Sequence, residues 1–164
     1  RNDLVEKYGV HPCHPKPKNY IYTLTDAFED LENDPKEVEE LNEVIKKYKV
    51  YKVMQKLPKN PPRPVKGSKV MNGSYFNLSR ESMYQPCSTI CQMNGQAGAA
   101  GNVHPLYDRK FTIAELKRIT SIPDDFKLTG TFAQQWERLG RMVPPIMMRE
   151  ISANIAKEIL CKLN

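Results

Sequence analysis

The sequence predicts an α+β protein in which helices at both ends of the chain flank a small, irregular β region. Helix-capping patterns at 34–35, 112–115 and 131–134 predict helices in the first and last thirds of the chain. Between them, short runs separated by proline- and glycine-rich turns over 65–108 predict strands of only a few residues.

The first third is expected to hold two helices after an irregular start. Residues 1–22 are expected to be irregular, because the proline-rich run HPCHPKPKNY (His11–Tyr20) within them cannot form a helix or a central strand. Residues 25–32 are predicted to form a short helix capped by Thr25. Asp34 is predicted to cap a longer helix that runs to Tyr48 or beyond. The apolar face of the longer helix consists of Val38, Leu41 and Ile45.

The middle of the chain is rich in residues that interrupt regular structure. The run LPKNPPRP (Leu57–Pro64) predicts a linker or an extended arm, and Asn72–Gly73 is a turn signal. The run NGQAGAAGN (Asn94–Asn102) contains three glycines and three alanines. We expect it to contribute no core and to form a loop that is flexible or closely approached by other groups.

The last third is expected to be helical. The capping box at 112–115 begins a helix that Pro123 ends, and the capping box at 131–134 begins a second helix followed by Gly140. The proline pair at 144–145 opens the last helix. The apolar stripe of this last helix consists of Ile151, Ile155 and Ile159.

Charge is distributed unevenly along the chain. Residues 26–43 contain nine acidic residues and one basic residue, whereas 46–80 contain ten basic residues and no acidic one. From Lys46 onward, 20 basic and 8 acidic residues give a net charge of +12. Such asymmetry favours a nucleic-acid partner, and the alternative is the solvated surface of a basic protein. No apolar run approaches the roughly 20 residues that span a bilayer, so we expect a cytoplasmic protein without a membrane partner.

The cysteine pattern favours free thiols in a reducing cytoplasm. The cysteines are Cys13, Cys87, Cys91 and Cys161. A zinc site would need Cys87, Cys91 and His104 together with a ligand from the distant 11–14 region, so no metal site is expected. The chain begins with Arg1, as expected of a fragment, a processed product or a tag-cleaved protein.

Four segments carry a resemblance to one family. RKFTIAELKRITSIPDDFKLTG (Arg109–Gly130) resembles the ninth conserved block of the DNA (cytosine-5) methyltransferases, and QQWERLGRMVPPIMMREISANIA (Gln134–Ala156) resembles the tenth. Upstream, PCSTI (Pro86–Ile90) resembles part of the family's target recognition region, and the initial RNDL resembles the sequence after the eighth block. The resemblance follows the family's order along the whole chain, with strong motifs only in 105–160.

The resemblance implies that this chain is the C-terminal part of such an enzyme. The family's nucleophile lies in a Pro-Cys pair that follows an apolar strand in the fourth block, whereas Pro86-Cys87 follows RESMYQ. Cys87 is therefore not expected to be catalytic, and the chain contains neither the Gly-rich cofactor loop nor the Glu-Asn-Val block. A Rossmann-like catalytic lobe is missing, either from the same enzyme or as a separate large subunit. The last helix would pack on that lobe, and in its absence a homodimer through this helix is expected.

The family also implies a division of the chain by role. It assigns 1–60 to a connecting segment with helices, 61–130 to the target recognition domain, and 131–164 to helices that return to the catalytic lobe. Two loops, near Lys66–Arg80 and Gln92–Asn102, are expected to read the major groove of double-stranded DNA. The DNA-binding residues that this predicts are Lys66, Lys69, Asn72, Arg80, Asn94, Gln96, Asn102 and Arg109.

The tenth block implies contact with S-adenosylmethionine, which the missing lobe would mainly hold. The residues concerned are Arg141, Met142 and Val143, and the first two stand where Asn and Ala or Ser are usual in the family. The Arg141 guanidinium is expected either to bind the cofactor carboxylate or to face solvent or DNA. The resemblance thus implies the recognition part of a restriction-modification methyltransferase from a bacterium or phage. The alternative is a non-catalytic DNA-binding module or regulatory relative of the family.

Overall fold

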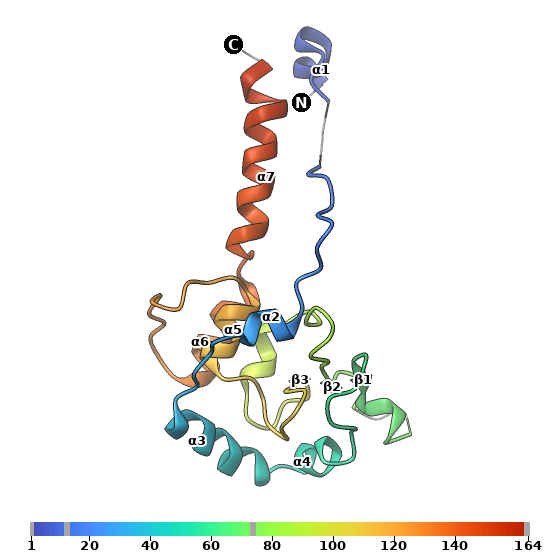
Figure 1. Cartoon of the computed structure of the whole chain (residues 1–164), viewed down its shortest axis with the longest axis vertical. Helices are drawn as coiled ribbons and strands as arrows, with labels where there is room; N and C mark the ends of the chain where they lie inside the picture. Colours follow the sequence, from blue (N-terminus) through green and yellow to red (C-terminus); the bar gives the residue numbers. More distant parts are fainter. Residues whose placement is uncertain (1, 12–13, 73–74, 163–164) are drawn as a thin grey trace. The chain divides into compact units, whose positions relative to one another are not determined.

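The computed structural model of the chain describes residues 2–11, 14–72 and 75–162, which belong to two compact units. One unit combines the residues up to Tyr20 with those from Val143 onward, and the other consists of Ile21–Met142. Figure 1 shows the elements of both units. The division into 1–60, 61–130 and 131–164 that the family resemblance implies differs from these two units, and it stays a prediction.

The smaller unit contains α1 (Asn2–Tyr8), α7 (Pro145–Glu158) and a 3₁₀ turn, η3 (Leu160–Lys162). The expectation that 1–22 holds no helix was wrong for α1, because the first proline stands at position 12 and leaves the preceding residues free to be helical. Lys18 joins α7 through an ion pair of 2.8 Å with Glu150.

The start of α7 confirms the prediction from the proline pair. Pro144 is its N-cap residue and Pro145 is its first residue. Ile159 lies at the C-cap, so the helix itself carries only Ile151 and Ile155 of the expected stripe, and none of its residues is buried. An apolar helix face of this kind is normally covered by another element.

In the larger unit, α2 (Leu24–Phe28) is capped by Thr23 and not by Thr25 as predicted. The Asp26 carboxylate accepts the Thr23 backbone N–H at 2.7 Å, which completes a capping box that Thr25 has no acidic partner to form. The Thr25 hydroxyl instead donates to the Met83 carbonyl at 2.9 Å.

The helix predicted to begin after Asp34 is confirmed as α3 (Pro35–Lys46). The Asp34 carboxylate accepts the Lys36 N–H at 3.0 Å. The helix ends two residues before Tyr48, where the chain turns and starts α4 (Lys49–Met54). Figure 1 shows these two helices following one another along one edge of the larger unit.

The predicted β region is confirmed as a three-stranded sheet of two-residue strands. It consists of β1 (Val65–Lys66), β2 (Ser79–Arg80) and β3 (Asn102–Val103), with β1–β2 antiparallel and β2–β3 parallel. Two 3₁₀ turns, η1 (Gly67–Lys69) and η2 (Gln92–Gly95), complete this part of the chain. Gly73 of the predicted turn lies outside the described residues, and Asn72 before it has a left-handed backbone with φ +43°.

The proline-rich segment after α4 breaks the helix, as predicted, but it is not a free linker. Leu57 is 2% exposed and belongs to the first hydrophobic cluster, and Pro61 is also buried. That cluster consists of Ile45, Val50, Val53, Met54, Leu57, Leu78 and Val103. The segment therefore packs against the same core as α4 and the sheet.

Both capping boxes of the last third are confirmed, at the starts of α5 (Ile113–Ile119) and α6 (Phe132–Arg141). The end of α5 comes before Pro123, at a left-handed Ser121 with φ +59°. Around these helices lies a second hydrophobic cluster of Leu24, Phe111, Leu116, Trp136 and Leu139.

Gly140 lies inside α6 and does not follow it, so its predicted role as the residue after the helix was wrong. A Cβ at this position would come within 2.6 Å of the Gln92 backbone nitrogen. The glycine therefore serves close packing of α6 against η2. Across the described residues, we find no helix with the length and apolar character that a membrane crossing requires.

Candidate functional site

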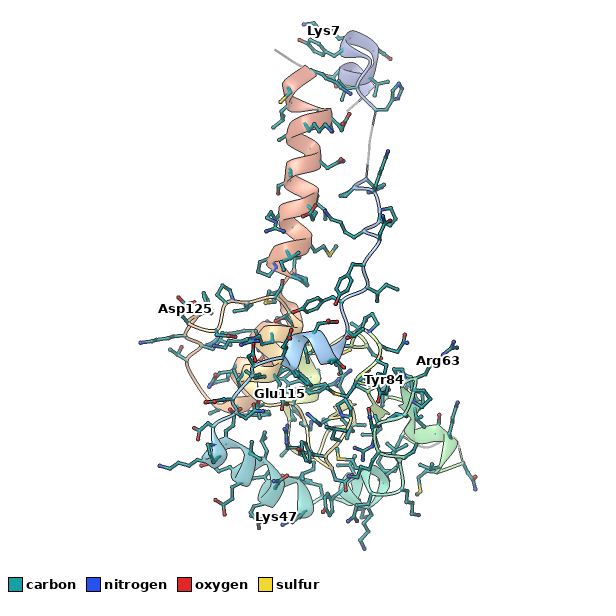
Figure 2. The ribbon with its side chains drawn as sticks, viewed as in Figure 1. Lys7, Lys47, Arg63, Tyr84, Glu115 and Asp125 are labelled. Carbon is teal, nitrogen blue, oxygen red and sulfur yellow. The ribbon has the colours of Figure 1, made fainter. Side chains whose placement is uncertain are left out.

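Exposed basic residues occur along the end of α3, along α4 and the proline-rich segment, and in β1–η1. Together they are called the basic surface. Figure 2 shows the labelled Lys47 and Arg63 side chains pointing away from the body of the unit. Nine basic residues between 46 and 69 are exposed, and this stretch contains no acidic residue. They are Lys46, Lys47, Lys49, Lys52, Lys56, Lys59, Arg63, Lys66 and Lys69. Among the described residues, Glu43 pairs with Lys46 at 2.7 Å and Asp108 pairs with Lys59 at 2.5 Å. The surface therefore carries a strong excess of positive charge.

The remaining basic residue of the 46–80 stretch, Arg80, is fully buried. Its guanidinium donates to the Met54 carbonyl at 2.7 Å and to the carbonyls of His104 and Tyr107 at 2.8 Å each. It also forms an ion pair with the Asp108 carboxylate. One cation therefore joins the end of α4, β2 and the 104–108 loop.

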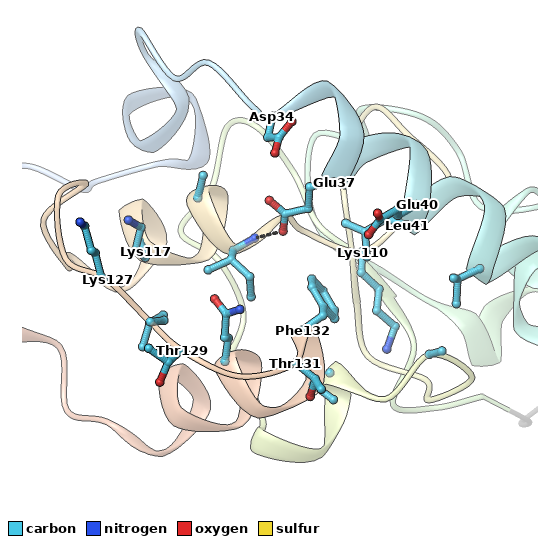
Figure 3. A pocket seen from close by; sticks show the side chains of 18 of the residues that line it. Asp34, Glu37, Glu40, Leu41, Lys110, Lys117, Lys127, Thr129, Thr131 and Phe132 are labelled. Carbon is cyan, nitrogen blue, oxygen red and sulfur yellow. Dashed lines mark hydrogen bonds between the residues drawn. The ribbon is translucent and has the colours of Figure 1, made fainter.

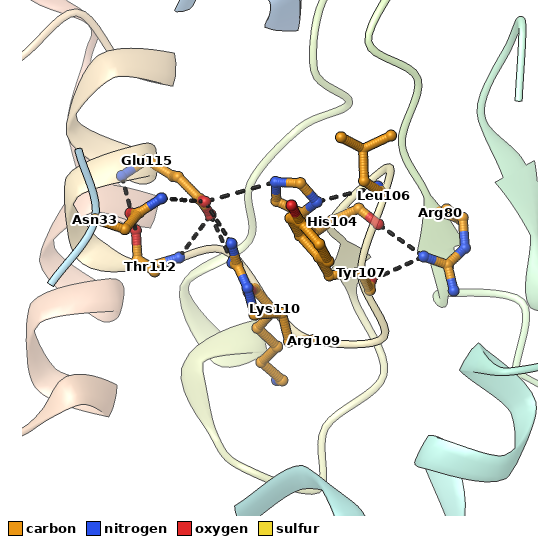
Figure 4. A network of polar contacts seen from close by, with 9 residues as sticks. All are labelled: Asn33, Arg80, His104, Leu106, Tyr107, Arg109, Lys110, Thr112 and Glu115. Atoms are coloured by element: carbon orange, nitrogen blue, oxygen red, sulfur yellow. Dashed lines mark hydrogen bonds and ion pairs between the residues drawn. The ribbon is translucent and has the colours of Figure 1, made fainter. Parts of the chain in front are cut away.

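A second buried cation, Arg109, joins the same loop to α5. Its guanidinium donates to both carboxylate oxygens of Glu115, at 2.7 and 2.8 Å, in a bidentate pair. The Glu115 carboxylate also accepts the Thr112 N–H and the Asn33 side-chain amide, at 2.9 Å each (Figure 4). Burial alone would raise the pKa of Glu115, but its bonds with Arg109 and the charges around it hold that pKa below the ordinary value.

His104 lies beside this network and is neutral. Its Nδ1 accepts the Leu106 N–H at 3.1 Å, and its Nε2 lies 3.5 Å from Glu115 Oε1. Its ring stacks on Phe28 at 5.6 Å between centroids. Burial lowers the pKa of His104 to about 3, so the imidazole supports the loop and does not titrate near neutral pH.

The predicted DNA-binding residues differ in exposure. Lys66, Lys69, Asn72 and Gln96 are exposed, Asn94 is half-buried, and Arg80, Asn102 and Arg109 are buried. The structure brings two of them into direct contact, since the Asn94 side-chain amide donates to Asn102 Oδ1 at 3.2 Å. Asn102 in turn donates to the buried Glu81 at 3.0 Å. The buried members thus bond within the protein and leave the exposed members to face solvent.

The glycines of the 94–102 loop are closely approached, as the sequence predicted. A Cβ at Gly95 would come within 2.5 Å of the Trp136 side chain, and one at Gly98 within 2.5 Å of the Tyr48 ring. A Cβ at Gly101 would meet the Asn94 side chain at 2.5 Å. The expectation that this loop contributes no core was wrong at Gly95, Gly101 and Asn102, which are all buried. The absent side chains of the two glycines let other groups pack on the backbone, and Asn102 belongs to β3 with its side chain bonded to Glu81.

Lys110 is a functional candidate that the sequence analysis missed. It is 4% exposed, and its ammonium donates to the Gln96 carbonyl at 2.7 Å and to the Asn94 carbonyl. The one sequence signal that could have identified it is its position directly after Arg109 in the ninth block.

The three predicted cofactor-side residues differ in exposure and in their contacts. Arg141 pairs with Glu137 at 2.7 Å and donates to the Gln92 side chain. Met142 is half-buried against the second cluster, and Val143 is 54% exposed and belongs to the other unit. Their contact with S-adenosylmethionine stays a prediction.

A groove of about 980 Å³ lies beside α3 in the larger unit. Its walls come from α3, α5, the 124–131 loop and the first turn of α6 (Figure 3). Asp34, Glu37 and Glu40 line one wall, and the Glu37 carboxylate accepts the Ile113 N–H at 2.8 Å. Burial raises the pKa of Glu37. The lining also includes Lys110, Lys117 and Lys127, so the groove carries charges of both signs.

Cys87 has the environment of a structural thiol. It packs against the second cluster, and burial together with Glu81 raises its pKa well above the ordinary value. The thiol is therefore protonated near neutral pH, which does not suit a nucleophile. Cys91 and Cys161 are exposed and free, and Cys13 lies outside the described residues. Within the described ranges, no three His, Cys, Asp or Glu residues come together as a metal site would require.

Comparison with known proteins agrees with the resemblance seen in the conserved blocks. The family model for C-5 cytosine-specific DNA methylases matches residues 2–157. A protein of Methanocaldococcus jannaschii with the assigned name type II methyltransferase M.MJ0563P is 39% identical over 62 residues, which are 38% of this chain and 20% of that protein. The type II methyltransferase M.DdeI of Desulfomicrobium norvegicum is 30% identical over 89 residues, which are 49% of this chain and 20% of that enzyme.

The chain spans about a fifth of the length of these curated relatives. The type II methyltransferase M.AplI of Arthrospira platensis shows the same proportion, with 28% identity over 74 residues that are 43% of this chain and 21% of that enzyme. No solved structure matches the chain significantly. Since the family model covers nearly all of its residues, the chain belongs to the C-5 cytosine-specific DNA methylase family.

Proposed function

We propose that this chain is the DNA-recognition part of a DNA (cytosine-5) methyltransferase. In the whole protein, a separate catalytic lobe would flip the target cytosine and transfer a methyl group from S-adenosylmethionine to its C5 atom. The observation that carries the proposal is the row of nine exposed basic residues without a carboxylate among them. Phosphate contacts made by such residues supply most of the sequence-independent affinity for DNA.

The predicted DNA-binding residues divide into two roles in this proposal. Lys66 and Lys69 contact phosphates, and the exposed Asn72 and Gln96 approach the base edges of the major groove. Asn94, which was predicted to read bases as well, is half-buried and bonded to Asn102, so it supports its loop. The buried residues Arg80, Asn102 and Arg109 hold the loops that carry them. This division follows from exposure, because a cation that is already bonded to buried carbonyls or carboxylates is not available to DNA.

The catalytic lobe is the proposed partner of α7. Exposed apolar side chains of this helix include Ile146 at 54%, Met147 at 55% and Ile155 at 38%. The lobe would cover them and hold most of the S-adenosylmethionine, with Arg141, Met142 and Val143 at the edge of the cofactor. In the isolated chain, a second copy would cover α7 instead, which gives a homodimer.

The proposal predicts DNA binding that weakens steeply with salt. Removing one phosphate-binding cation should reduce the slope of log K against log salt by about 0.9. Lys52→Gln, on the basic surface, is expected to reduce the slope by about that amount. Lys127→Gln, at an exposed lysine that lines the groove beside α3, should leave the slope unchanged. Binding of a duplex by fluorescence anisotropy at several salt concentrations measures this. An affinity independent of salt would contradict the proposal.

Methyl transfer is expected only when the chain meets its catalytic lobe. Mixing the chain with the separately produced lobe should give transfer from labelled S-adenosylmethionine to duplex DNA, because each part lacks what the other supplies. A lobe whose Pro-Cys cysteine is replaced by serine is the control and should give none. If the mixture is inactive while the chain still binds DNA, the chain is instead a non-catalytic binding module of the same family.

A further inference from the structure

Lys110 has an unusual environment for a lysine. It is 4% exposed, and its ammonium lies 5.6 Å from the centroid of the Trp136 ring. A buried cation is unfavourable unless other groups compensate for its lost hydration. Here two backbone carbonyls, those of Asn94 and Gln96, and the face of the Trp136 ring do so. Figure 3 shows the Lys110 side chain extended along the groove wall with its ammonium at the far end.

The carbonyls that Lys110 binds belong to the turn formed by η2, which is fixed from a second side by α6. The Trp136 indole N–H donates to the Cys91 carbonyl at 3.1 Å, and Gly95 lies close against the Trp136 side chain. Met93 and Gln96 remain open to solvent, since Met93 is 56% exposed and Gln96 is also exposed. The turn is therefore anchored on its inner side and open on its outer side.

Arg109 and Lys110 are adjacent in sequence but bind different segments. Arg109 binds Glu115 of α5, whereas Lys110 binds the turn at 94–96. Figure 4 shows the Arg109 side chain reaching Glu115 and the Lys110 side chain extending away from it. This dipeptide therefore links α5 to the turn. Removing the Lys110 ammonium would break the link at the turn while the Arg109–Glu115 pair stays in place.

We propose that Lys110 is a positioning residue for base recognition, holding the Asn94–Gln96 backbone so that the exposed Met93 and Gln96 side chains meet a DNA groove in one orientation. The proposal rests on the proposed function. Its physical basis is preorganisation: a loop that is ordered before binding loses less conformational entropy on binding. Lys110 acts through the turn and does not touch DNA.

The first test compares sequence discrimination in two lysine variants. Lys110→Met keeps an unbranched side chain but removes the donors. Lys117→Met is the matched control, because the Lys117 ammonium also donates to two backbone carbonyls, but those of Asp124 and Phe126, which belong to a different loop. A randomised duplex pool selected on the unaltered chain supplies a preferred duplex, and a scrambled duplex of the same composition serves as the reference.

Lys110→Met is expected to lower the preferred-to-scrambled affinity ratio by about tenfold, the discrimination of one good base contact. Affinity for the scrambled duplex should not change, and Lys117→Met should retain both values. A merely structural role for Lys110 would lower both affinities together. An unchanged ratio in Lys110→Met would overturn the proposal.

A second test needs no DNA and separates this proposal from the proposed function. Amide hydrogen exchange at 92–97 is expected to be at least about tenfold faster in Lys110→Met than in the unaltered chain or Lys117→Met. Lys110→Gln, which keeps an amide donor, should restore part of the protection and replaces Lys110→Met if that variant does not fold. Unchanged exchange overturns the positioning role. If the unaltered chain does not bind DNA, the proposed function fails, while the exchange result still decides whether Lys110 orders the turn.

Discussion

Replacing Arg80 by leucine is expected to destabilise the larger unit by about 3–5 kcal/mol, the usual cost of removing one partner of a buried ion pair. The Arg80 guanidinium is the shared donor for three carbonyls, those of Met54, His104 and Tyr107, and it pairs with Asp108. Leucine fills part of the space but leaves these acceptors without their donor. The three segments that meet at Arg80 are then no longer joined by a common group.

Urea denaturation followed by Trp136 fluorescence measures the free energy of unfolding in this test. Trp136 is buried in the same unit and is the one tryptophan of the chain, so its signal reports on that unit alone. Arg63→Leu is the matched control, because Arg63 is exposed and a substitution there should change the free energy by no more than about 0.5 kcal/mol. A loss of stability below about 1 kcal/mol in Arg80→Leu would show that the unit does not depend on this cation.

Acid is expected to destabilise the larger unit before most of its carboxylates titrate, because of His104. In the unfolded chain this histidine takes up a proton below its ordinary pKa of about 6.5, whereas burial lowers its pKa to about 3 in the folded unit. Between these values the unfolded state binds more protons, so stability falls as the pH falls. At about 1.4 kcal/mol for each pH unit, the loss between about pH 6.5 and pH 4 is about 3 kcal/mol.

Two carboxylates change this loss of stability in acid in opposite directions. The lowered pKa of Glu115 means that its stabilisation is present above its unfolded pKa and is lost as the pH falls through the folded value. The raised pKa of Glu37 has the opposite sign, since its contribution is greatest in acid and is lost as the pH rises through the folded value. Glu115 therefore adds to the loss of stability that His104 causes in acid. Glu37 partly offsets that loss at pH values near the ordinary pKa of a carboxyl group.

Thermal denaturation between about pH 4 and pH 7 tests the His104 assignment. His104→Asn keeps an acceptor for the Leu106 N–H but does not titrate, so it should be less stable at neutral pH and show a shallower loss of stability toward acid. His11→Asn alters an exposed histidine in the other unit and should keep the full pH dependence. If the stability of His104→Asn falls toward acid as steeply as that of the unaltered protein, the loss of stability in acid belongs to other groups.

The parts of the fold that could be predicted from sequence are those whose causes are local. The caps at Asp34, Thr112 and Thr131 depend on groups within three residues, and all three are confirmed. The cap of α2 was misplaced because two threonines stand close together and the deciding Asp26 carboxylate favours the first. Gly140 was misassigned because its role depends on η2, which lies far earlier in the sequence.

In the candidate site as well, only the features with local causes could be predicted from the sequence. The basic surface followed from the run of lysines, since charged residues without partners remain exposed. Residue type alone could not show that Arg80 is buried, because its partners lie 24–28 residues away in the sequence. Lys110 was missed for the same reason, since the carbonyls that it binds lie 14 and 16 residues earlier.

The close packing around Gly95, Gly98 and Gly101 has a consequence for how this loop can change during evolution. Each glycine faces a side chain that leaves no space for a Cβ, so these positions tolerate little substitution. Met93 and Gln96 lie between or beside them and are exposed, so they can vary without repacking the unit. Under the proposed recognition role, single substitutions at these two positions would alter the preferred DNA sequence of a lineage and keep the same scaffold.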